Sequence, residues 1–317
     1  MSAEPEFSIV ITCHYEEQSI DEFYTRLKAA AESLGRSYEL VMVNDGSTDG
    51  TFEKLKGFFD RDPRVTTVID LYRNAGQVNA MTAGLTHTRG RAIAFMDSDL
   101  QLDPGDLPLL VRTFDEGYDI VSGHRKDRKD SFLRKIPSRL ANVVMRKVAR
   151  HKLSDFGCTY KIYDARLVRA FEFGPFKPWR TAYVFSRAQR CVEVPVSHRE
   201  RKYGESGWTF RKLFGFYMDH LVGISERPFQ LMSLLCLAFA VLFAARIALA
   251  WAVPISILPE VTTGVILNAV AFSLLVVLSV LAAIGEYVMR NFLMTQRYPG
   301  YVIREIHEKH PTTGADG

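Results

Sequence analysis

The chain has 317 residues, of which 47% are hydrophobic and 24% are charged, so it is long enough for one large domain or two ordinary ones. Its formal net charge of +4 is small, and no arginine-rich tract with interleaved aromatic residues occurs, which argues against a nucleic-acid partner. The four cysteines form no Cys-x-x-Cys pair, so reduced thiols are predicted and not a disulfide frame or a zinc site. The acidic stretch 1–6 lacks an apolar core, and no signal peptide is expected there.

Short apolar runs alternate with helical patterns along residues 7–123. The runs rich in β-branched residues predict strands at 7–12, 39–43, 65–71, 92–96 and 119–123. Apolar residues at helical spacing, together with turn and capping residues, predict helices at 21–34, 51–59, 76–86 and 107–116. Because strands that alternate with helices pair in parallel through crossover helices, a doubly wound α/β domain is predicted.

Two later stretches, 131–152 and 208–222, combine apolar residues with many lysines and arginines at helical spacing. Basic amphipathic helices of this kind commonly lie on anionic membrane surfaces. The alternative for the first stretch is a solvated helix face against the domain core. The long apolar runs that follow favour the membrane-surface interpretation.

Residues 229–253 and 262–289 are apolar runs long enough to cross a hydrocarbon core of about 30 Å at about 1.5 Å per residue. The connector 254–260 carries no Lys or Arg, whereas several arginines flank the outer ends of the pair. The positive-inside rule therefore predicts a transmembrane hairpin with both termini in the cytoplasm. The predicted organisation is a cytosolic domain at 1–225 that includes the basic helices, a hairpin at 229–289 and a cytosolic tail at 290–317.

The apolar run 94–96 ends in Asp97 and Asp99, two carboxylates separated by Ser98. Strands that end this way present their acids at the carboxyl edge of a sheet, where open α/β folds bind ligands. A carboxylate there can hold a hard divalent cation, which can bridge the phosphates of a nucleotide. The plainer alternative is an ordinary turn, because Asp-x-Asp is frequent in turns.

Four segments carry a more specific signal in this order: 11–18 (ITCHYEEQ), 43–49 (VNDGSTD), 73–77 (RNAGQ) and 97–101 (DSDLQ). The set resembles the inverting glycosyltransferases of family 2, which have a GT-A (Rossmann-like) α/β fold. It is most similar to their polyprenyl-phosphate branch, which includes dolichyl-phosphate mannose synthase, the undecaprenyl-phosphate glucosyltransferases and the undecaprenyl-phosphate aminoarabinose transferase. The resemblance extends over nearly the whole chain, hairpin included.

The resemblance implies a site for a nucleotide diphosphate sugar that draws on all four segments. The donor-binding residues that it implies are Tyr15, Glu17, Val43, Asp45, Gln77, Asp97, Ser98, Gln101 and Arg125. Asp99 would bind Mg²⁺ or Mn²⁺ on the diphosphate, where the metal neutralises charge on the leaving nucleoside diphosphate.

The resemblance also implies an acceptor site. It places Arg201 in a loop that closes over the donor and acceptor phosphates. Lys202 and Arg134 are further candidates for the acceptor phosphate, and Lys202 or Arg199 is the candidate to replace the lysine that the family usually has at position 207. Asp155, in the segment 154–161, is the candidate base or the acid that positions the acceptor, and an ordinary turn aspartate is the alternative. A phosphate monoester with a second pKa of about 6 is already largely dianionic, so the reaction does not demand a strong base. Asp155, Asp99 and Arg201 are the expected catalytic residues.

Several positions depart from the pattern of the family. Cys13 and Glu16 stand where relatives usually have proline and asparagine, and Asn44 replaces the first acid of an Asp-Asp-Gly-Ser turn. Gly207 stands where relatives usually have a lysine, so one phosphate-binding cation is missing.

Together these features predict inverting transfer of a sugar, from a UDP-sugar in preference to a GDP-sugar, to undecaprenyl or another polyprenyl phosphate for cell-envelope glycan or lipid modification. The predicted location is the bacterial inner membrane. A homo-tetramer is left open, with the apolar tail 298–306 reaching a neighbouring subunit. The alternative from another class is a catalytically silent nucleotide- or lipid-binding module, which Gly207 favours. A processive polysaccharide synthase is less favoured, because it needs more spans and a Gln-x-x-Arg-Trp motif that this chain lacks.

Overall fold

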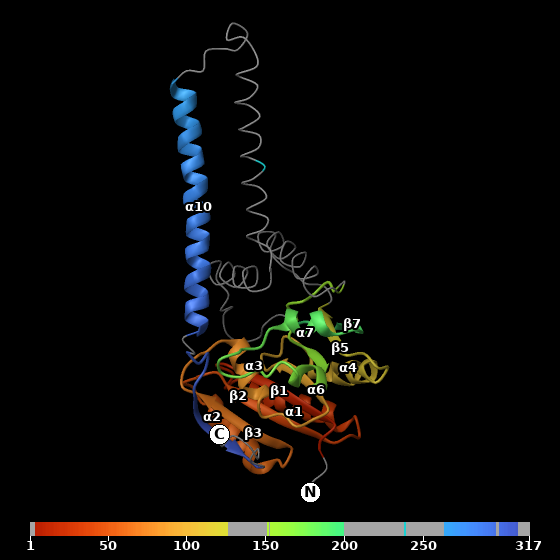
Figure 1. Cartoon of the computed structure of the whole chain (residues 1–317). Coiled ribbons are helices and arrows are strands. Elements are labelled where there is room, and N and C mark those ends of the chain that lie inside the picture. The colour runs from red at the N-terminus through yellow and green to blue at the C-terminus, as the bar shows by residue number, and fades with distance from the viewer. Residues whose placement is uncertain are drawn as a thin grey trace. The chain divides into compact units, whose positions relative to one another are not determined.

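The computed structural model describes residues 4–125, 151, 153–199, 238, 263–295 and 298–309 (Figure 1). The chain divides into two compact units, of which the first comprises Met1–Phe210 with Pro299–Gly317 and the second comprises Arg211–Tyr298. Several predictions lie outside the described residues: the basic helices except for His151, the first apolar run except for Ala238, and Arg134, Arg201, Lys202 and Gly207.

In the described part of the first unit, eight strands form one sheet in the order β7-β5-β6-β4-β1-β2-β3-β8. The strands are β1 Phe7–Cys13, β2 Tyr38–Asn44, β3 Val65–Leu71, β4 Ala92–Asp97, β5 Ile120–Arg125, β6 Lys161–Asp164, β7 Cys191–Val196 and β8 Ile303–Glu308. The predicted strands correspond to β1–β5, with ends that differ by at most two residues.

The central strands are parallel, as the alternation of strands and helices predicts. β1 pairs in parallel with β2 and β4, and β2 pairs in parallel with β3. The parallel pattern does not continue from β4 to β5, because β6 lies between them and is antiparallel to both. β7 then adds in parallel to β5.

The last strand closes the other edge of the sheet. β8 pairs antiparallel with β3, so the segment that the sequence suggested could reach a neighbouring subunit lies against its own chain. The edge of β3 is thereby covered, and a covered edge does not offer unpaired backbone groups to other chains.

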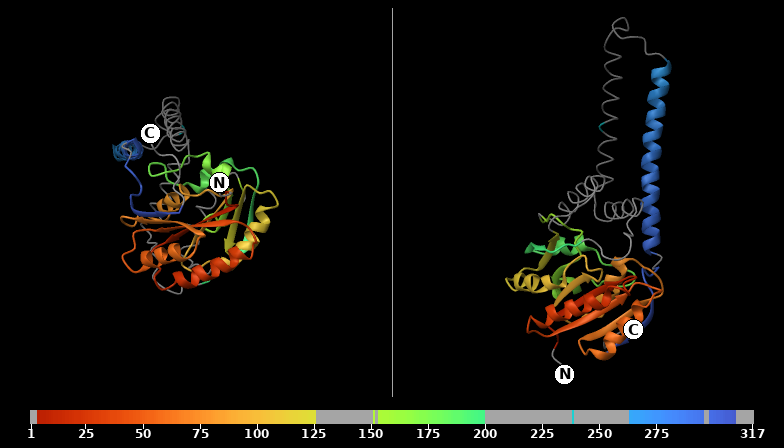
Figure 2. Two further views of the ribbon diagram at one scale, coloured as in Figure 1. Left: turned by 90° about the horizontal axis from the view of Figure 1, so that it is seen from below. Right: turned by 180° about the vertical axis from the view of Figure 1, so that it is seen from behind.

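Helices cover both faces of the sheet (Figure 2). One face carries α1 Ile20–Glu32, α2 Thr51–Arg61 and α4 Leu107–Phe114, which the short 3₁₀ turn Pro104–Asp106 precedes. The opposite face carries α3 Gln77–Leu85, α6 Ala165–Arg169 and α7 Thr181–Arg187.

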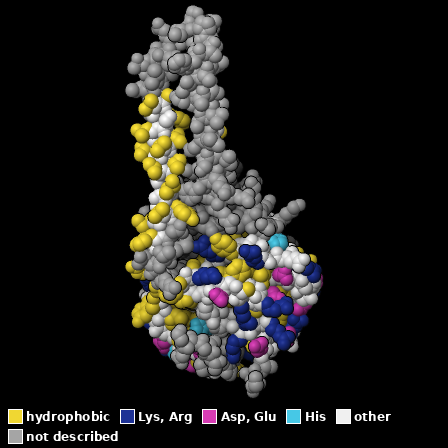
Figure 3. Space-filling model, viewed as in Figure 1, with side chains coloured by type: hydrophobic (Ala, Val, Ile, Leu, Met, Phe, Trp, Pro, Cys, Tyr) yellow, Lys and Arg dark blue, Asp and Glu magenta, His cyan; other side chains and the backbone are white. Residues whose placement is uncertain are grey.

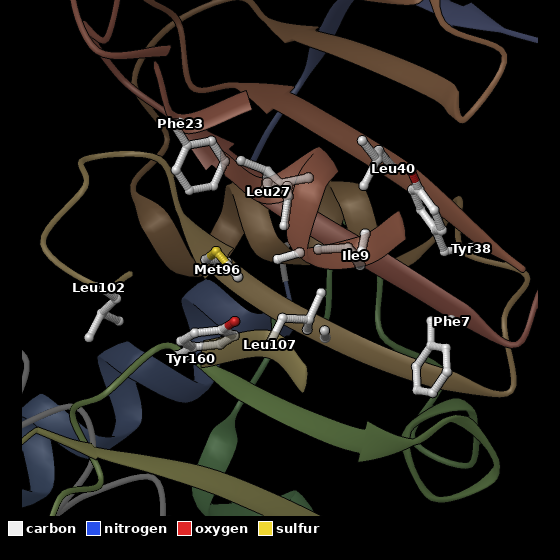
Figure 4. Packing of buried hydrophobic residues seen from close by; sticks show 14 of the residues in the cluster. Phe7, Ile9, Phe23, Leu27, Tyr38, Leu40, Met96, Leu102, Leu107 and Tyr160 are labelled. Carbon is white, nitrogen blue, oxygen red and sulfur yellow. The ribbon is translucent and has the colours of Figure 1, made fainter. Parts of the chain in front are cut away.

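The side chains of each central strand alternate between the two cores, because successive side chains of a strand point to opposite faces. Ile9 and Ile11 of β1 pack in the cluster beneath α1, α2 and α4, whereas Val10 packs beneath α3. Figure 4 shows Phe23 and Leu27 of α1 lying over the strands in the first cluster. Every residue of β1, β2 and β3 is buried, as expected for strands that are covered on both faces.

The second unit contains the helix α10, Thr263–Thr295, which includes most of the second predicted span. Hydrophobic side chains along it, such as Phe272 and Leu281, are exposed. Within the described part of the chain, no helix combines the length and the apolar character that crossing a membrane requires. Figure 3 shows that, on the face of the first unit in view, Lys and Arg side chains are interspersed with Asp and Glu.

Candidate active site

The carboxyl ends of β1, β2, β3 and β4 lie next to one another because these strands are parallel. The register pairs Cys13 with Asn44, Asn44 with Asp70, and Thr12 with Asp97. The loops that follow these ends contain the four motif segments, so the fold brings all four to one edge of the sheet. Open α/β sheets bind their ligands at this edge.

Asp45 organises two of these loops. Its side chain is buried, with Oδ1 accepting a hydrogen bond from the Ala75 amide at 2.7 Å and Oδ2 accepting one from the Gly76 amide at 3.0 Å. Burial raises the pKa of the Asp45 carboxyl above its ordinary value, and the two backbone donors act in the opposite direction. Both carboxylate oxygens therefore fix the loop after β3 against the turn after β2.

Two features of the backbone explain why residue 46 in that turn is glycine. Its φ of +67° lies in the left-handed region that favours glycine. A Cβ atom at this position would also lie 2.2 Å from the carbonyl carbon of Arg73. The turn after β2 and the loop after β3 thus touch backbone to backbone.

Tyr15 presents an aromatic ring at the same edge. Its side chain is 55% exposed, its φ is 58°, and its amide donates to Ser47 Oγ at 3.0 Å. Left-handed backbone at a residue with a bulky side chain is uncommon and concentrates at functional sites. The ring is therefore held open to solvent by the turn after β2, in a position to stack on a planar ligand.

Two predicted donor residues have structural contacts. Glu17 Oε2 accepts a hydrogen bond from the Gly50 amide at 3.0 Å, which satisfies a backbone donor at the start of α2. Val43 is fully buried against Ile69, Leu71 and α3, so its backbone is the part of it that can face the edge.

The acid pair follows β4. Oδ1 of Asp97 accepts hydrogen bonds from Thr12 Oγ1 at 2.9 Å and from Gln77 Nε2 at 2.6 Å. Gln77 Nε2 also lies 3.1 Å from Thr159 Oγ1, which joins the loop after β3 to the predicted acceptor segment. Ser98 is buried, and its hydroxyl donates to the carbonyl of Thr12 at 3.0 Å.

Asp99 is held by the turn that follows it. Its Oδ1 accepts a hydrogen bond from the Gln101 amide at 3.1 Å, across Leu100, whose φ is 58°. The described residues include no group of three or more His, Cys, Asp or Glu side chains that could hold a metal ion by themselves. Magnesium is commonly bound by one or two carboxylates plus substrate phosphates. The hard oxygens of Asp97 and Asp99 therefore fit a divalent cation whose remaining ligands come from a bound diphosphate and water.

Arg125 and Asp155 form a fork of two hydrogen bonds beside β5. Arg125 Nε donates to Oδ2 at 2.7 Å and Nη2 donates to Oδ1 at 2.8 Å, while the Arg125 amide donates to Oδ2 at 3.3 Å. Burial raises the pKa of the Asp155 carboxyl, but the hydrogen bonds and charge of Arg125, with the charge of Lys161, outweigh it and lower the pKa to about 2. Asp155 is therefore a weak base that holds a guanidinium.

Glu193 of β7 supports this fork. Its carboxylate accepts hydrogen bonds from the Ser154 amide and the Asp155 amide, each at 2.8 Å, and from Ser154 Oγ at 2.7 Å. Lys161 is buried beneath the same segment and donates to the carbonyl of Phe156 at 3.2 Å, and burial lowers its pKa. Glu193 was not among the predicted site residues. Its only signal there is an acid inside an otherwise apolar strand, CVEVPV.

The residues just before Arg201 approach the acid-pair loop. The Arg199 amide donates to the carbonyl of Gln101 at 2.8 Å, and His198 forms a β-bridge with Leu102. Arg199 also pairs with Asp103 at 2.7 Å. The chain therefore lies against the end of the DSDLQ segment just before it enters the predicted phosphate-binding loop.

The structure brings together most of the predicted site residues that it describes. The carboxyl ends of β1 to β4 and the residues that follow them include Tyr15, Asp45, Gln77, Asp97, Asp99 and Gln101. Arg125 and Asp155 are bonded to each other, and the Gln77–Thr159 hydrogen bond joins the segment that contains Asp155 to this edge. Thr12 and Thr159 join this network and were not predicted.

The sequence of this chain is similar to those of known proteins. A family model described as "Glycosyl transferase family 2" matches residues 8–171. The chain is 33% identical over 306 residues to the undecaprenyl-phosphate 4-deoxy-4-formamido-L-arabinose transferase of Edwardsiella ictaluri (strain 93-146), covering 94% of this chain and 93% of that protein.

Solved structures support the fold. Glucosyl-3-phosphoglycerate synthase from Mycobacterium tuberculosis with Mn²⁺ and UDP-glucose superimposes with a TM-score of 0.52 at 18% identity, over 70% of this chain and 81% of that chain. The same enzyme with Mg²⁺ and UDP gives a TM-score of 0.51 at 18% identity, with the same coverage. At this identity the likeness shows the GT-A fold alone. Through the family match and the long alignment, the chain belongs to glycosyltransferase family 2 and is a glycosyltransferase.

Proposed function

We propose that this chain transfers a sugar from a nucleotide diphosphate sugar, with UDP favoured, to undecaprenyl or another polyprenyl phosphate, giving a lipid-linked sugar for cell-envelope modification. The observation that carries the proposal is the 33% identity over 94% of the chain to an undecaprenyl-phosphate transferase. A relative that shares the whole length, and not the catalytic domain alone, is the best guide to the acceptor.

In this proposal the nucleotide lies across the ends of β1 and β2. The exposed ring of Tyr15 stacks on the base, and the turn that Asp45 and Gly46 fix shapes the ribose pocket. Asp97, which Gln77 and Thr12 hold in place, accepts a ribose hydroxyl with its second carboxylate oxygen. Glu17, Val43 and Ser98 act through the backbone positions that they secure.

Asp99 would hold Mg²⁺ or Mn²⁺ on the diphosphate with Asp97 nearby, and the cation would stabilise the charge that develops on the leaving nucleoside diphosphate. Gln101 lies beside the sugar in this arrangement. The left-handed backbone at Leu100 lies within the turn in which the Gln101 amide donates to Asp99 Oδ1.

Arg125 binds a phosphate in this proposal, and Asp155 is its positioning residue. The Asp155 carboxylate accepts hydrogen bonds from Nε and Nη2 and so fixes the orientation of the guanidinium, whose positive charge attracts a phosphate. A polyprenyl phosphate is largely dianionic near neutral pH, so it attacks without a strong base. Arg201, Lys202 and Arg134 complete the acceptor phosphate site in the proposal.

The phosphate oxygen attacks the anomeric carbon as the nucleoside diphosphate departs from the opposite face. One carbon–oxygen bond forms as the other breaks, so the configuration inverts. An α-linked donor then gives a β-linked lipid phosphate sugar.

The proposal places the enzyme at the cytoplasmic face of the bacterial inner membrane. The hairpin at 229–253 and 262–289, the basic helices at 131–152 and 208–222, and cytoplasmic termini belong to it, as does a tetramer as the open oligomeric state. A polyprenyl phosphate is confined to the bilayer, so a catalytic domain fused to a membrane anchor would meet its acceptor there.

The test is transfer to a radiolabelled short-chain polyprenyl phosphate in detergent, with a panel of UDP-sugars and GDP-sugars and with Mn²⁺ or Mg²⁺. Asp99→Asn removes one carboxylate charge at the metal site and is expected to reduce transfer by about a hundredfold or more. Asp60→Asn is the matched control, because Asp60 is an exposed acid near the end of α2 that lies away from the donor turn.

Lipid-linked product from one donor, lost on adding EDTA and in Asp99→Asn but kept in Asp60→Asn, would establish the activity and name the sugar. Nucleotide binding without product from any donor would favour the silent binding module instead. In that case Gly207→Lys would be the first substitution to test for recovery.

A further inference from the structure

Asp70, at the end of β3, is a buried carboxylate that the proposed reaction does not use. Its Oδ1 accepts a hydrogen bond from Asn44 Nδ2 at 2.7 Å, and its Oδ2 pairs with Arg304 Nε at 2.6 Å. The side chain of Asp70 is 2% exposed, whereas that of Arg304 is 45% exposed. A buried carboxylate is costly unless it is paired and hydrogen-bonded, so these two partners account for its presence.

Arg304 reaches Asp70 from an irregularity in β8. The register pairs Asp70 with Glu305 and Leu71 with Ile303, so Arg304 is the residue left without a cross-strand partner. Bulges of this kind redirect a side chain and are typical of sheet edges next to functional sites. The irregularity thus serves the contact between the C-terminal strand and the end of β3.

Asn44 links Asp70 to the loops of the donor site. Its Oδ1 lies 3.4 Å from the Ser47 amide, and Ser47 Oγ accepts a hydrogen bond from the Tyr15 amide at 3.0 Å. Asn44 also precedes Asp45, whose carboxylate holds the loop at Ala75. A continuous path of polar contacts therefore runs from Arg304 through Asp70, Asn44 and Ser47 to Tyr15.

The identity of residue 44 follows from this path. Relatives in the family resemblance have an acid at this position, but a carboxylate here would face Asp70 at hydrogen-bond distance. Two adjacent carboxylates cannot both stay ionised without cost, and one half-exposed guanidinium bonded through a single nitrogen offsets little of it. An amide at position 44 removes the second charge and supplies the donor that Asp70 needs.

We propose that Asp70 and Arg304 are positioning residues for the nucleotide-binding turn, so that the C-terminal strand β8 is part of the donor site. The proposal rests on the proposed function for the identity of the ligand. Arg304 pairs with residue 70, and positions 44 and 70 together require one carboxylate and one amide.

The experiment compares four variants of the full-length protein in detergent: Asn44→Asp, Asp70→Asn, the exchange of both residues, and Arg304→Gln. In the exchanged protein the amide at 70 can donate to the carboxylate at 44 and accept from Arg304, so every hydrogen bond has a counterpart. The matched control is Glu305→Gln, which neutralises the next residue of β8, an exposed glutamate 3.8 Å from Lys56.

Two readouts are taken with each variant. UDP affinity in the presence of Mn²⁺ is measured by calorimetry, and amide hydrogen exchange of peptides covering 44–50 and 73–77 is measured without nucleotide. Asn44→Asp is expected to weaken UDP binding by about tenfold and to speed amide hydrogen exchange in both peptides. Arg304→Gln is expected to weaken UDP binding by about three- to tenfold. The UDP affinity of the protein with both residues swapped should return to within about threefold of the wild type. Glu305→Gln should have the UDP affinity of the wild type.

The proposal is overturned if the losses of UDP affinity caused by Asn44→Asp and Asp70→Asn add up in the protein that carries both substitutions. It is also overturned if amide hydrogen exchange in the two peptides stays at the wild-type rate in all variants. The proposal is supported if amide hydrogen exchange is faster in the single variants and returns to the wild-type rate in the protein with both residues swapped. If the wild type binds no UDP while this exchange pattern is seen, the positioning role stands and the proposed donor is what fails.

Discussion

At the scale of single residues, the fork between Arg125 and Asp155 makes a prediction about acid stability. The Asp155 carboxyl has a pKa of about 2, against 3.8 ordinarily, so its contribution to stability is complete above about pH 4 and is lost as the pH falls toward about 2. Asp155→Asn should therefore lower the free energy of unfolding by about 2 kcal/mol at pH 6. The difference from the wild type should shrink between about pH 4 and pH 2, as followed by thermal unfolding at each pH.

Asp115→Asn is the control for this prediction. Asp115 also accepts two hydrogen bonds from one guanidinium, those of Arg36 Nη1 and Nη2, both at 2.8 Å. The side chains of Asp115 and Arg36 are, however, 41% and 34% exposed. Because exposed pairs contribute little, that substitution should cost less than about 1 kcal/mol at every pH. Equal losses in the two variants would show that burial does not set the strength of the Asp155 pair.

Two glycines with similar backbone angles offer a second test at this scale. Gly46 and Gly35 have φ of +67° and +63°, but a Cβ at Gly46 would lie 2.2 Å from the Arg73 backbone, whereas a Cβ at Gly35 meets nothing within 4 Å. Gly35→Ala should cost about 1–2 kcal/mol of backbone strain and leave UDP affinity unchanged. Gly46→Ala should cost more and weaken UDP binding, because the loop at 73–74 must move. Matching effects of the two changes on UDP affinity would contradict a packing role for Gly46.

At the scale of secondary structure, the sequence predicted what local patterns determine. β1 to β4 and the helices between them are apolar runs punctuated by turn residues, and the site loops follow directly from where those runs end. Asp97 and Asp99 could therefore be placed at the edge of the sheet in advance. Contacts between distant residues could not: nothing near Asp155 in the sequence signals that Arg125, 30 positions earlier, grips both of its oxygens.

β8 shows the same limit. Its sequence, IREIHE, is half charged and follows a long apolar run, so hydrophobic alternation alone gives a weak strand signal. Its place in the sheet comes from tertiary contacts, which include the pairing with β3 and the buried Tyr301 just before it. No strand was accordingly predicted at 303–308, where the fold has an edge strand.

Tyr301 anchors β8, which leads to a prediction about this element. Tyr301 is 6% exposed and packs with Val43, Ile69 and Ala83. Tyr301→Ala should lower the free energy of unfolding by about 3–5 kcal/mol through the cavity it leaves. Tyr301→Phe keeps the ring and should change the free energy of unfolding by less than about 1 kcal/mol. Denaturant unfolding measures both. Tyr298→Ala, at a side chain that is 73% exposed, should change stability by less than about 0.5 kcal/mol.

At the scale of the whole molecule, the first unit is discontinuous in the sequence. Met1–Phe210 needs Pro299–Gly317 to complete its sheet, and the residues of the second unit lie between them. A polypeptide that ends at residue 210 therefore lacks β8, exposes the edge of β3 and leaves Asp70 without Arg304. Both consequences favour aggregation and instability.

This discontinuity predicts how the two units can be separated. A chain in which a flexible Gly/Ser linker of about 25 residues, with a typical reach of about 25–30 Å, joins residue 210 to residue 299 should be monodisperse and bind UDP with the affinity of the full-length protein. The chain that ends at residue 210 should aggregate, as judged by size-exclusion chromatography, or have a melting temperature well below that of the linked chain, as judged by thermal unfolding. The linked chain should also lose transfer to polyprenyl phosphate in vesicles, since the proposed anchor is gone. If the chain ending at residue 210 is as stable as the linked one, β8 is dispensable for the fold, and the donor site does not depend on the C-terminal strand.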